Sequence, residues 1–204
     1  LPELLLPAVE DFRTLPVARR RTITFQESAD GNTFYIDSGN GPVQFDPSRV
    51  DSTIQSGTIE EWTILNPTGE WHVFHIHQTN FQITEKNGLP LPFTGHQDTV
   101  NVDYQADNNS PPGQVKLLID FRDPNIIGRF VYHCHILEHE DGGMMAVAEV
   151  LPPGGLVSAD RRNGTWLAKA GGAVRDTLTQ AVGHITGAER QMARIRREAQ
   201  FAAA

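Results

Sequence analysis

One short string of the sequence restricts the possible fold more than any other part. It reads HCHILEHEDGGMM and holds the only cysteine, Cys134, between His133 and His135, with His139 and Met144 close behind. Cysteine, histidine and a weak methionine together form the ligand set of a blue-copper electron-transfer site. Because strand side chains alternate between faces, a strand here would point Cys134 away from both flanking histidines. A metal at Cys134 would then be joined by a short covalent path to whatever those histidines bind.

A second string, WHVFHIHQTNFQI, supplies further histidines. In a strand, His75 and His77 share one face and His72 lies on the other. One predicted site combines the ligands that share a face with the cysteine, which are His72, Cys134 and His139, with Met144 as the axial ligand. The second predicted site combines the remaining histidines, which are His75, His77, His133 and His135.

Two alternatives concern the metal and its axial ligand. Zinc also binds sets of cysteine and histidine, but a thioether adds little to a zinc site and fits copper. Met145 competes with Met144 for the axial position, and since adjacent strand residues face opposite sides, only one of them can be a ligand.

Together, the two strings resemble the C-terminal copper-binding motifs of the multicopper oxidases, which include laccases, bilirubin-oxidase-like enzymes and spore-coat-type bacterial oxidases. The family patterns are H-x-x-H-x-H and H-C-H-x-x-x-H-x-x-x-x-M, and every defined position is filled here. Val73 stands where the family often has proline. The segments GTIEEWTILNPTGEW, HQDTVNVD and PPGQVKLLIDF also fit, so the resemblance covers roughly residues 20–151.

The resemblance implies a role for each matched residue. The implied type 1 copper ligands are His72, Cys134, His139 and Met144. The implied type 2 ligand is His75, and the implied type 3 ligands are His77, His133 and His135. In the family, small reductants give up electrons one at a time near the type 1 site, and a trinuclear cluster reduces O2 to water. Cys134 would pass electrons to His133 and His135.

Glu140 directly follows His139 and has two interpretations. A solvated loop carboxylate is the simpler one. Some bacterial members of the family have an acid here that resembles a proton donor to the oxygen site, and water formation does require protons at a buried cluster. Glu138 and Asp141 are weaker candidates for the same role.

The resemblance to a complete oxidase stops at the trinuclear cluster. In the family this cluster takes eight histidines from four motifs, whereas four histidines match here, and neither His96 nor His184 is assigned to a metal. We therefore expect the C-terminal domain of a longer oxidase, or a subunit completed by another cupredoxin chain. A stand-alone blue-copper module without O2 reduction is the alternative. Such a carrier has no need of the four cluster histidines, which favours the oxidase.

The chain divides into three predicted parts. Residues 1–19, broken by prolines, are expected to be an interdomain linker, and residues 20–151 a copper-binding domain. Residues 152–204 are expected to form a linker and an amphipathic helical tail, packed on the domain or frayed, with a partner or membrane-surface helix as the alternative. Short β-rich runs between turn signals predict an all-β fold, and the resemblance implies a Greek-key cupredoxin barrel or sandwich. The predicted strands lie near 21–26, 33–37, 58–65, 72–84, 98–103, 114–121, 129–135 and 144–151.

Charge and hydropathy exclude some classes of function. The net charge of -8 argues against nucleic-acid binding, which needs a basic surface. It weakly favours cationic or neutral reductants over anions. The sequence has no apolar run as long as a membrane span. The acidic, proline-broken N-terminus does not resemble a signal peptide, so only the family resemblance suggests a periplasmic or secreted location.

Overall fold

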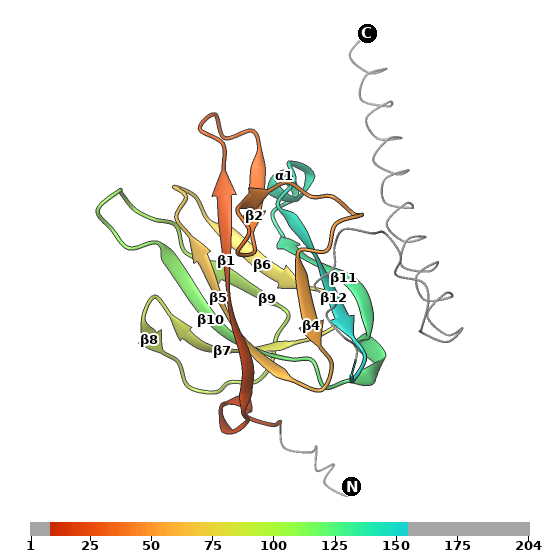
Figure 1. Ribbon diagram of the computed structural model, residues 1–204. Coiled ribbons are helices and arrows are strands. Elements are labelled where there is room, and N and C mark those ends of the chain that lie inside the picture. Colours follow the sequence, from red (N-terminus) through yellow and green to blue (C-terminus); the bar gives the residue numbers. More distant parts are fainter. Residues whose placement is uncertain (1–8, 155–204) are drawn as a thin grey trace, which may run out of the picture. The chain divides into compact units, whose positions relative to one another are not determined.

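A computed structural model describes residues 9–154, which form a sandwich of two β-sheets (Figure 1). The larger sheet has seven strands in the order β3-β2-β1-β5-β10-β7-β8, and the smaller has five in the order β4-β12-β11-β6-β9. The pairs β1–β5 and β4–β12 run parallel, and the other pairs run antiparallel. The predicted all-β class is confirmed.

The structure gives the following bounds for its elements. The strands are β1 Val17–Glu27, β2 Phe34–Asp37, β3 Pro42–Val43, β4 Ser52–Gln55, β5 Ile59–Asn66, β6 His72–Ile76, β7 Phe81–Lys86, β8 Leu89–Pro90, β9 Thr99–Val102, β10 Gly113–Asp120, β11 Gly128–Cys134 and β12 Met145–Leu151. The helical elements are the 3-10 turns η1 Phe12–Thr14 and η2 Pro124–Ile126 and the short helix α1 Leu137–Asp141. None of the helices in residues 9–154 has the length and apolar character needed to cross a membrane.

The core lies between the two sheets because each strand buries alternate side chains. Trp62 on β5 is fully buried, and its ring packs edge-on against Tyr132 on β11, with centroids 5.2 Å apart. Phe74 on β6 lies 6.4 Å from Trp62 and 6.2 Å from Tyr132. Aromatic contacts of this kind add to simple area burial, so this cluster ties the seven-stranded sheet to the five-stranded one. Cys134 and Met144 belong to the same buried cluster.

A buried ion pair reinforces the larger sheet. Arg21 Nε donates to Glu60 Oε2 at 2.6 Å, and both side chains are almost fully buried. Trp62 Nε1 donates to the same carboxylate oxygen at 2.9 Å. Arg21 also donates to the Thr53 carbonyl on β4 of the other sheet. Glu60 therefore satisfies two buried donors at once, one of them charged.

The expected strand over 72–84 is wrong as a single element. The chain forms β6 in the smaller sheet, turns at residues 77–80 with Gln78 at a φ of 65°, and enters β7 in the larger sheet. A left-handed residue is uncommon outside glycine and interrupts a strand. The strand β4 and the helix α1 had no counterpart among the expected elements. The two buried residues of β4 are Ser52 and Ile54. Because one of them is polar, the sequence shows no alternation of apolar and polar residues that would have predicted this strand.

The observed domain start differs from the expected boundary at residue 20. β1 begins at Val17, and Phe12 is buried against Ile59 and Leu118. Phe12, with Leu15 packed against the same small cluster, therefore belongs to the sandwich. The predicted helical tail lies outside the described residues, apart from 152–154.

Replacing Glu60 with alanine should destabilise the domain by about 3–5 kcal/mol, because the Arg21 cation would remain buried without its partner. The matched control is Glu61→Ala on the same strand. Its partner Arg20 is largely exposed, so we expect a loss of at most about 1 kcal/mol. Urea unfolding followed by tryptophan fluorescence measures both, and equal losses would contradict the role given to Glu60.

Candidate metal centre

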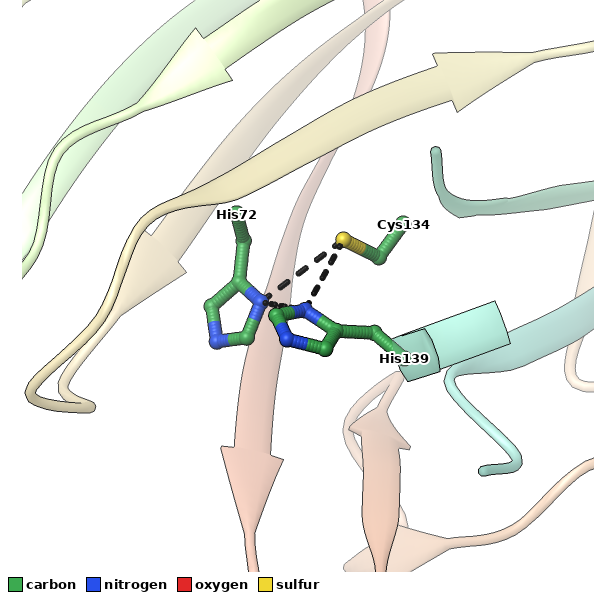
Figure 2. Close-up of side chains that lie close together, drawn as sticks. All are labelled: His72, Cys134 and His139. Carbon is green, nitrogen blue, oxygen red and sulfur yellow. Dashed lines mark hydrogen bonds between the residues drawn. The ribbon is translucent and has the colours of Figure 1, made fainter. Parts of the chain in front are cut away.

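Three buried side chains from three elements converge at one end of the sandwich (Figure 2). His72 begins β6, Cys134 ends β11 and His139 lies in α1. The two Nδ1 atoms lie 2.9 Å apart, and Cys134 Sγ lies 3.6 Å from His72 Nδ1 and 3.5 Å from His139 Nδ1. The structure thus brings together the three strong ligands of the first predicted site.

This triangle has the size that a metal ion requires. A point about 1.9 Å from all three atoms exists at its centre, close to the roughly 2.0–2.3 Å at which zinc binds the same atom types. Two histidine nitrogens and one thiolate in a trigonal arrangement are the donor set of a blue-copper site. The residues therefore fit a copper ion of this type.

The loop after Cys134 places His139 and Met144. α1 ends at Asp141 and is followed by Gly142 and Gly143, and Met144 N–H then donates to the His139 carbonyl at 2.9 Å. Cys134 N–H donates to the Met144 carbonyl at 3.1 Å, which closes the loop. Gly143 has a φ of 109°, a conformation that strains any residue with a Cβ. Met144 is fully buried in the cluster that contains Cys134, whereas Met145 is only partly buried.

Burial keeps the two imidazoles of this triangle in their neutral form. Burial, with a smaller contribution from neighbouring His139, lowers the pKa of the His72 imidazole from 6.5 to about 3. Burial also lowers the pKa of His139 and raises the pKa of the Cys134 thiol. At neutral pH both imidazoles are therefore neutral, as metal ligands must be. A bound cation would favour the thiolate and offset the rise in the thiol pKa.

The outer nitrogens of both imidazoles have protein partners. His72 Nε2 lies 2.9 Å from Thr68 Oγ1, and His139 Nε2 lies 3.3 Å from Glu70 Oε1. Partners on the far nitrogen are common in metal-bound histidines. Sequence reasoning missed Thr68 and Glu70. The signal available was the string NPTGE, residues 66–70, which ends two residues before His72 and has the composition of a simple turn.

The second histidine group gathers on the opposite face of β6 and β11. Ligand nitrogens of His75, His77 and His133 all lie within 4.8 Å of one another. His75 and His133 are opposite each other in the β6–β11 ladder. The His135 ring lies 5.0 Å from the His75 ring and 5.4 Å from the His133 ring. The four histidines of the second predicted site therefore share one region.

Hydrogen bonds orient this group. His133 Nδ1 lies 2.9 Å from the Cys134 carbonyl, so it must donate, and its Nε2 faces His77 Nε2 at 3.2 Å. His75 Nδ1 lies 2.9 Å from the Asp98 carbonyl, which again requires a donor. The backbone of Asp98, not its carboxylate, thus supports His75. Partial desolvation of the ring by the surrounding protein, assisted by neighbouring histidines, lowers the pKa of His77 to about 4 although part of the side chain is exposed. For His133 burial lowers the pKa to about 4 as well.

This histidine group is open to solvent, whereas the first site is buried. His77 and His135 are exposed, and a cleft of about 310 Å³ lies beside His75 and His77. Glu140 lies at the same region, with Oε2 3.3 Å from His133 Nδ1, and burial raises the pKa of its carboxyl. His96 stacks on Phe12 elsewhere, and His184 lies outside the described residues.

The two-sheet sandwich with this histidine and cysteine arrangement defines the cupredoxin class of fold. The multicopper oxidase family profile matches residues 13–154. The chain therefore belongs to the multicopper oxidase family, which uses copper, and the recognition made from the two strings is confirmed.

Individual relatives agree with this assignment. The multicopper oxidase mco of Staphylococcus haemolyticus is 36% identical over 114 residues, which cover 52% of this chain and 23% of that protein. A Bacillus subtilis laccase is 31% identical over 118 residues, 51% of this chain and 22% of that protein. The multicopper oxidase of Pediococcus acidilactici superposes with a TM-score of 0.53 at 30% identity, over 74% of this chain and 29% of that structure. The chain spans about a quarter of the length of such relatives.

Copper(I) should stabilise the chain against thermal unfolding, by about 2.7 kcal/mol at a hundredfold excess over its dissociation constant. The Cys134→Ala variant should lose most of this stabilisation, because the thiolate is the strongest ligand of the buried triangle. The double variant His77→Ala/His135→Ala removes only exposed histidines and should keep it. Equal stabilisation of the cysteine variant would place the main copper site elsewhere.

Proposed function

We propose that this chain provides the electron-entry site and half of the oxygen-reducing site of a laccase-like multicopper oxidase. The observation that supports this proposal most directly is that Cys134 belongs to the buried triangle, whereas its neighbours His133 and His135 belong to the open histidine group. The triangle, with Met144 as axial ligand, would be the type 1 site. His75 would serve the type 2 position, and the type 3 positions would use His77, His133 and His135. Bound copper supplies one-electron redox chemistry at the first site and four-electron reduction of O2 to water at the second.

Cys134 would act as the electron bridge between the two sites. Its side chain points into the core, and its backbone leads in one residue to either flanking histidine. The Cys134 carbonyl also accepts a hydrogen bond from His133 Nδ1, which gives a second short connection. The fixed strand backbone keeps both connections short, so this chain's part in the reaction is positioning.

The reductant would approach on the side of His139. This residue is 5% exposed, and its Nε2 meets Glu70, which is exposed at the surface. The carboxylate and the net charge of -8 favour cationic or neutral reductants over anions. Relatives named laccases support phenolic or similar small organic reductants.

The remaining ligands of the oxygen-reducing site would come from a second cupredoxin domain, on the same longer chain or on another one. The open histidine group supports this, because His77 and His135 offer ring nitrogens at the surface beside a cleft. A stand-alone electron carrier would have no use for four gathered histidines. The stand-alone blue-copper module therefore remains the weaker alternative.

The purified chain should bind about one copper with an intense blue thiolate band and only a type 1 signal in electron paramagnetic resonance. Oxygen uptake with a phenolic reductant should be negligible, since four histidines cannot hold three coppers in their usual coordination. His139→Ala should remove the blue colour, whereas His77→Ala should leave it. Fast oxygen uptake, or three to four coppers with a type 2 signal, would show that chains complete the cluster among themselves.

Glu140 would donate protons to oxygen at the second site. The contact with His133 and the raised carboxyl pKa support this, because a higher pKa brings a carboxyl closer to the working pH, where a general acid is most effective. In the oxidase completed by its second domain, Glu140→Gln should slow O2 reduction by about 10²–10⁴-fold. The blue band should be unchanged. The matched control is Glu138→Gln, one of the weaker candidates, and an equal effect from it would remove the special role of Glu140.

A further inference from the structure

His72 is the most deeply buried imidazole of the triangle, and the two nitrogens of its ring meet different surroundings. Nδ1 faces Cys134 and His139, whereas Nε2 faces Thr68 Oγ1 at 2.9 Å. The ring is fully buried. A neutral imidazole carries its proton on one nitrogen only, so the group at Nε2 determines whether Nδ1 presents a lone pair or a proton.

The direction of the hydrogen bond between Thr68 and His72 follows from a third residue. Asn66 Oδ1 accepts the Thr68 backbone N–H at 3.0 Å, and Asn66 Nδ2 donates to the Glu70 carbonyl at 2.8 Å. Both backbone partners have fixed polarity, so the orientation of the Asn66 amide is fixed. Thr68 Oγ1 lies 2.7 Å from Asn66 Oδ1 and must donate its only proton there, or to the Glu70 carbonyl at 3.2 Å. Neither choice leaves a proton for His72.

We propose that Thr68 is a positioning residue that holds His72 in its Nε2-protonated form, so that the Nδ1 lone pair faces the metal position before any metal binds. The inference rests on the proposed type 1 site for the identity of that metal. Thr68 is 7% exposed, and Asn66, which sets the direction of its hydroxyl, is fully buried. Because Asn66 is fully buried and cannot exchange its partners for water, this hydrogen-bonded series retains its polarity.

The tautomer of His139 is fixed less strictly than that of His72. Thr68 is therefore the better residue for testing how the protein sets the tautomer of a ligand histidine. Its outer nitrogen meets the Glu70 carboxylate at 3.3 Å, but Glu70 is exposed and open to competition from water. Solvent can replace Glu70 as the acceptor. No solvent reaches His72, so the loss of the Thr68 hydroxyl would leave a buried N–H without a partner.

The test uses Thr68→Val, which keeps the shape of the side chain and removes the hydroxyl, and Thr68→Ser, which restores it. The control is Thr84→Val, which removes a partly buried strand hydroxyl bonded to the Lys116 carbonyl. The first readout is the tautomer of His72 in the metal-free chain, from long-range nitrogen–proton correlation spectra. The second is the copper(I) dissociation constant, from competition with a chromophoric chelator.

The wild-type chain, Thr68→Ser and Thr84→Val should all show the Nε2-protonated His72. Thr68→Val should populate the Nδ1-protonated form and raise the copper(I) dissociation constant about 10–100-fold. A purely structural role for Thr68 would lower stability and change neither readout. An Nδ1-protonated His72 in the wild type, or a Thr68→Val variant with unchanged tautomer and affinity, would overturn the proposal.

The two proposals fail in different ways. A wild-type chain that takes up copper without a blue thiolate band would end the type 1 assignment, while the metal-free spectra would still decide the role of Thr68. A blue wild-type chain with no change in Thr68→Val would end only the present inference.

Discussion

The alternation of side chains at the end of β11 is the constraint on which both proposed metal sites depend. Cys134 points into the core, whereas His133 on β11 and His135 just beyond its end lie together on the other face, as the alternation of extended residues requires. Pairing with β6 then puts His133 opposite His75 and Cys134 opposite Phe74. The N–H of Val73, which lies on β6, donates to Cys134 Sγ at 3.4 Å. Two backbones therefore set the spacing of two groups of ligands, and neither group can move without the other.

The buried triangle depends in turn on the core around it. If both imidazoles carry their proton on Nε2, as proposed for His72, their Nδ1 lone pairs face each other across 2.9 Å, and a cation between them would stabilise that arrangement. Packing maintains this arrangement: the His139 ring stacks on Phe34 at 4.4 Å, and the His72 ring lies 5.1 Å from Phe25. The free energy of folding therefore keeps the ligands close together.

The sequence predicted which side chains gather into the two groups better than it predicted their surroundings. The ligand strings could be interpreted because strand parity alone separates Cys134 from His133 and His135. The helix α1 that carries His139 could not be predicted, since five residues are too few to show a helical period. Thr68 and Asn66 escaped notice because a turn string such as NPTGE carries hydrogen-bond information only once the partners are placed. The turn at Gln78 was missed although residues 77–80 are all polar, because the β-branched and aromatic residues on both sides of them favour strand.

The contrast between the two ligand groups explains how a stable domain can present only half of the proposed oxygen-reducing site. The triangle is buried, so the domain's own core satisfies and orients its donors. The second group has its inner nitrogens fixed by backbone carbonyls, as at His75 and His133, but His77 and His135 remain at the surface. This domain alone can orient a ligand histidine, through a hydrogen bond to the ring nitrogen that does not bind metal. Enclosing a metal also needs donor atoms that face this group from a second domain. The proposed second domain would therefore meet a half-site that is already arranged, which lowers the entropy cost of completing the cluster.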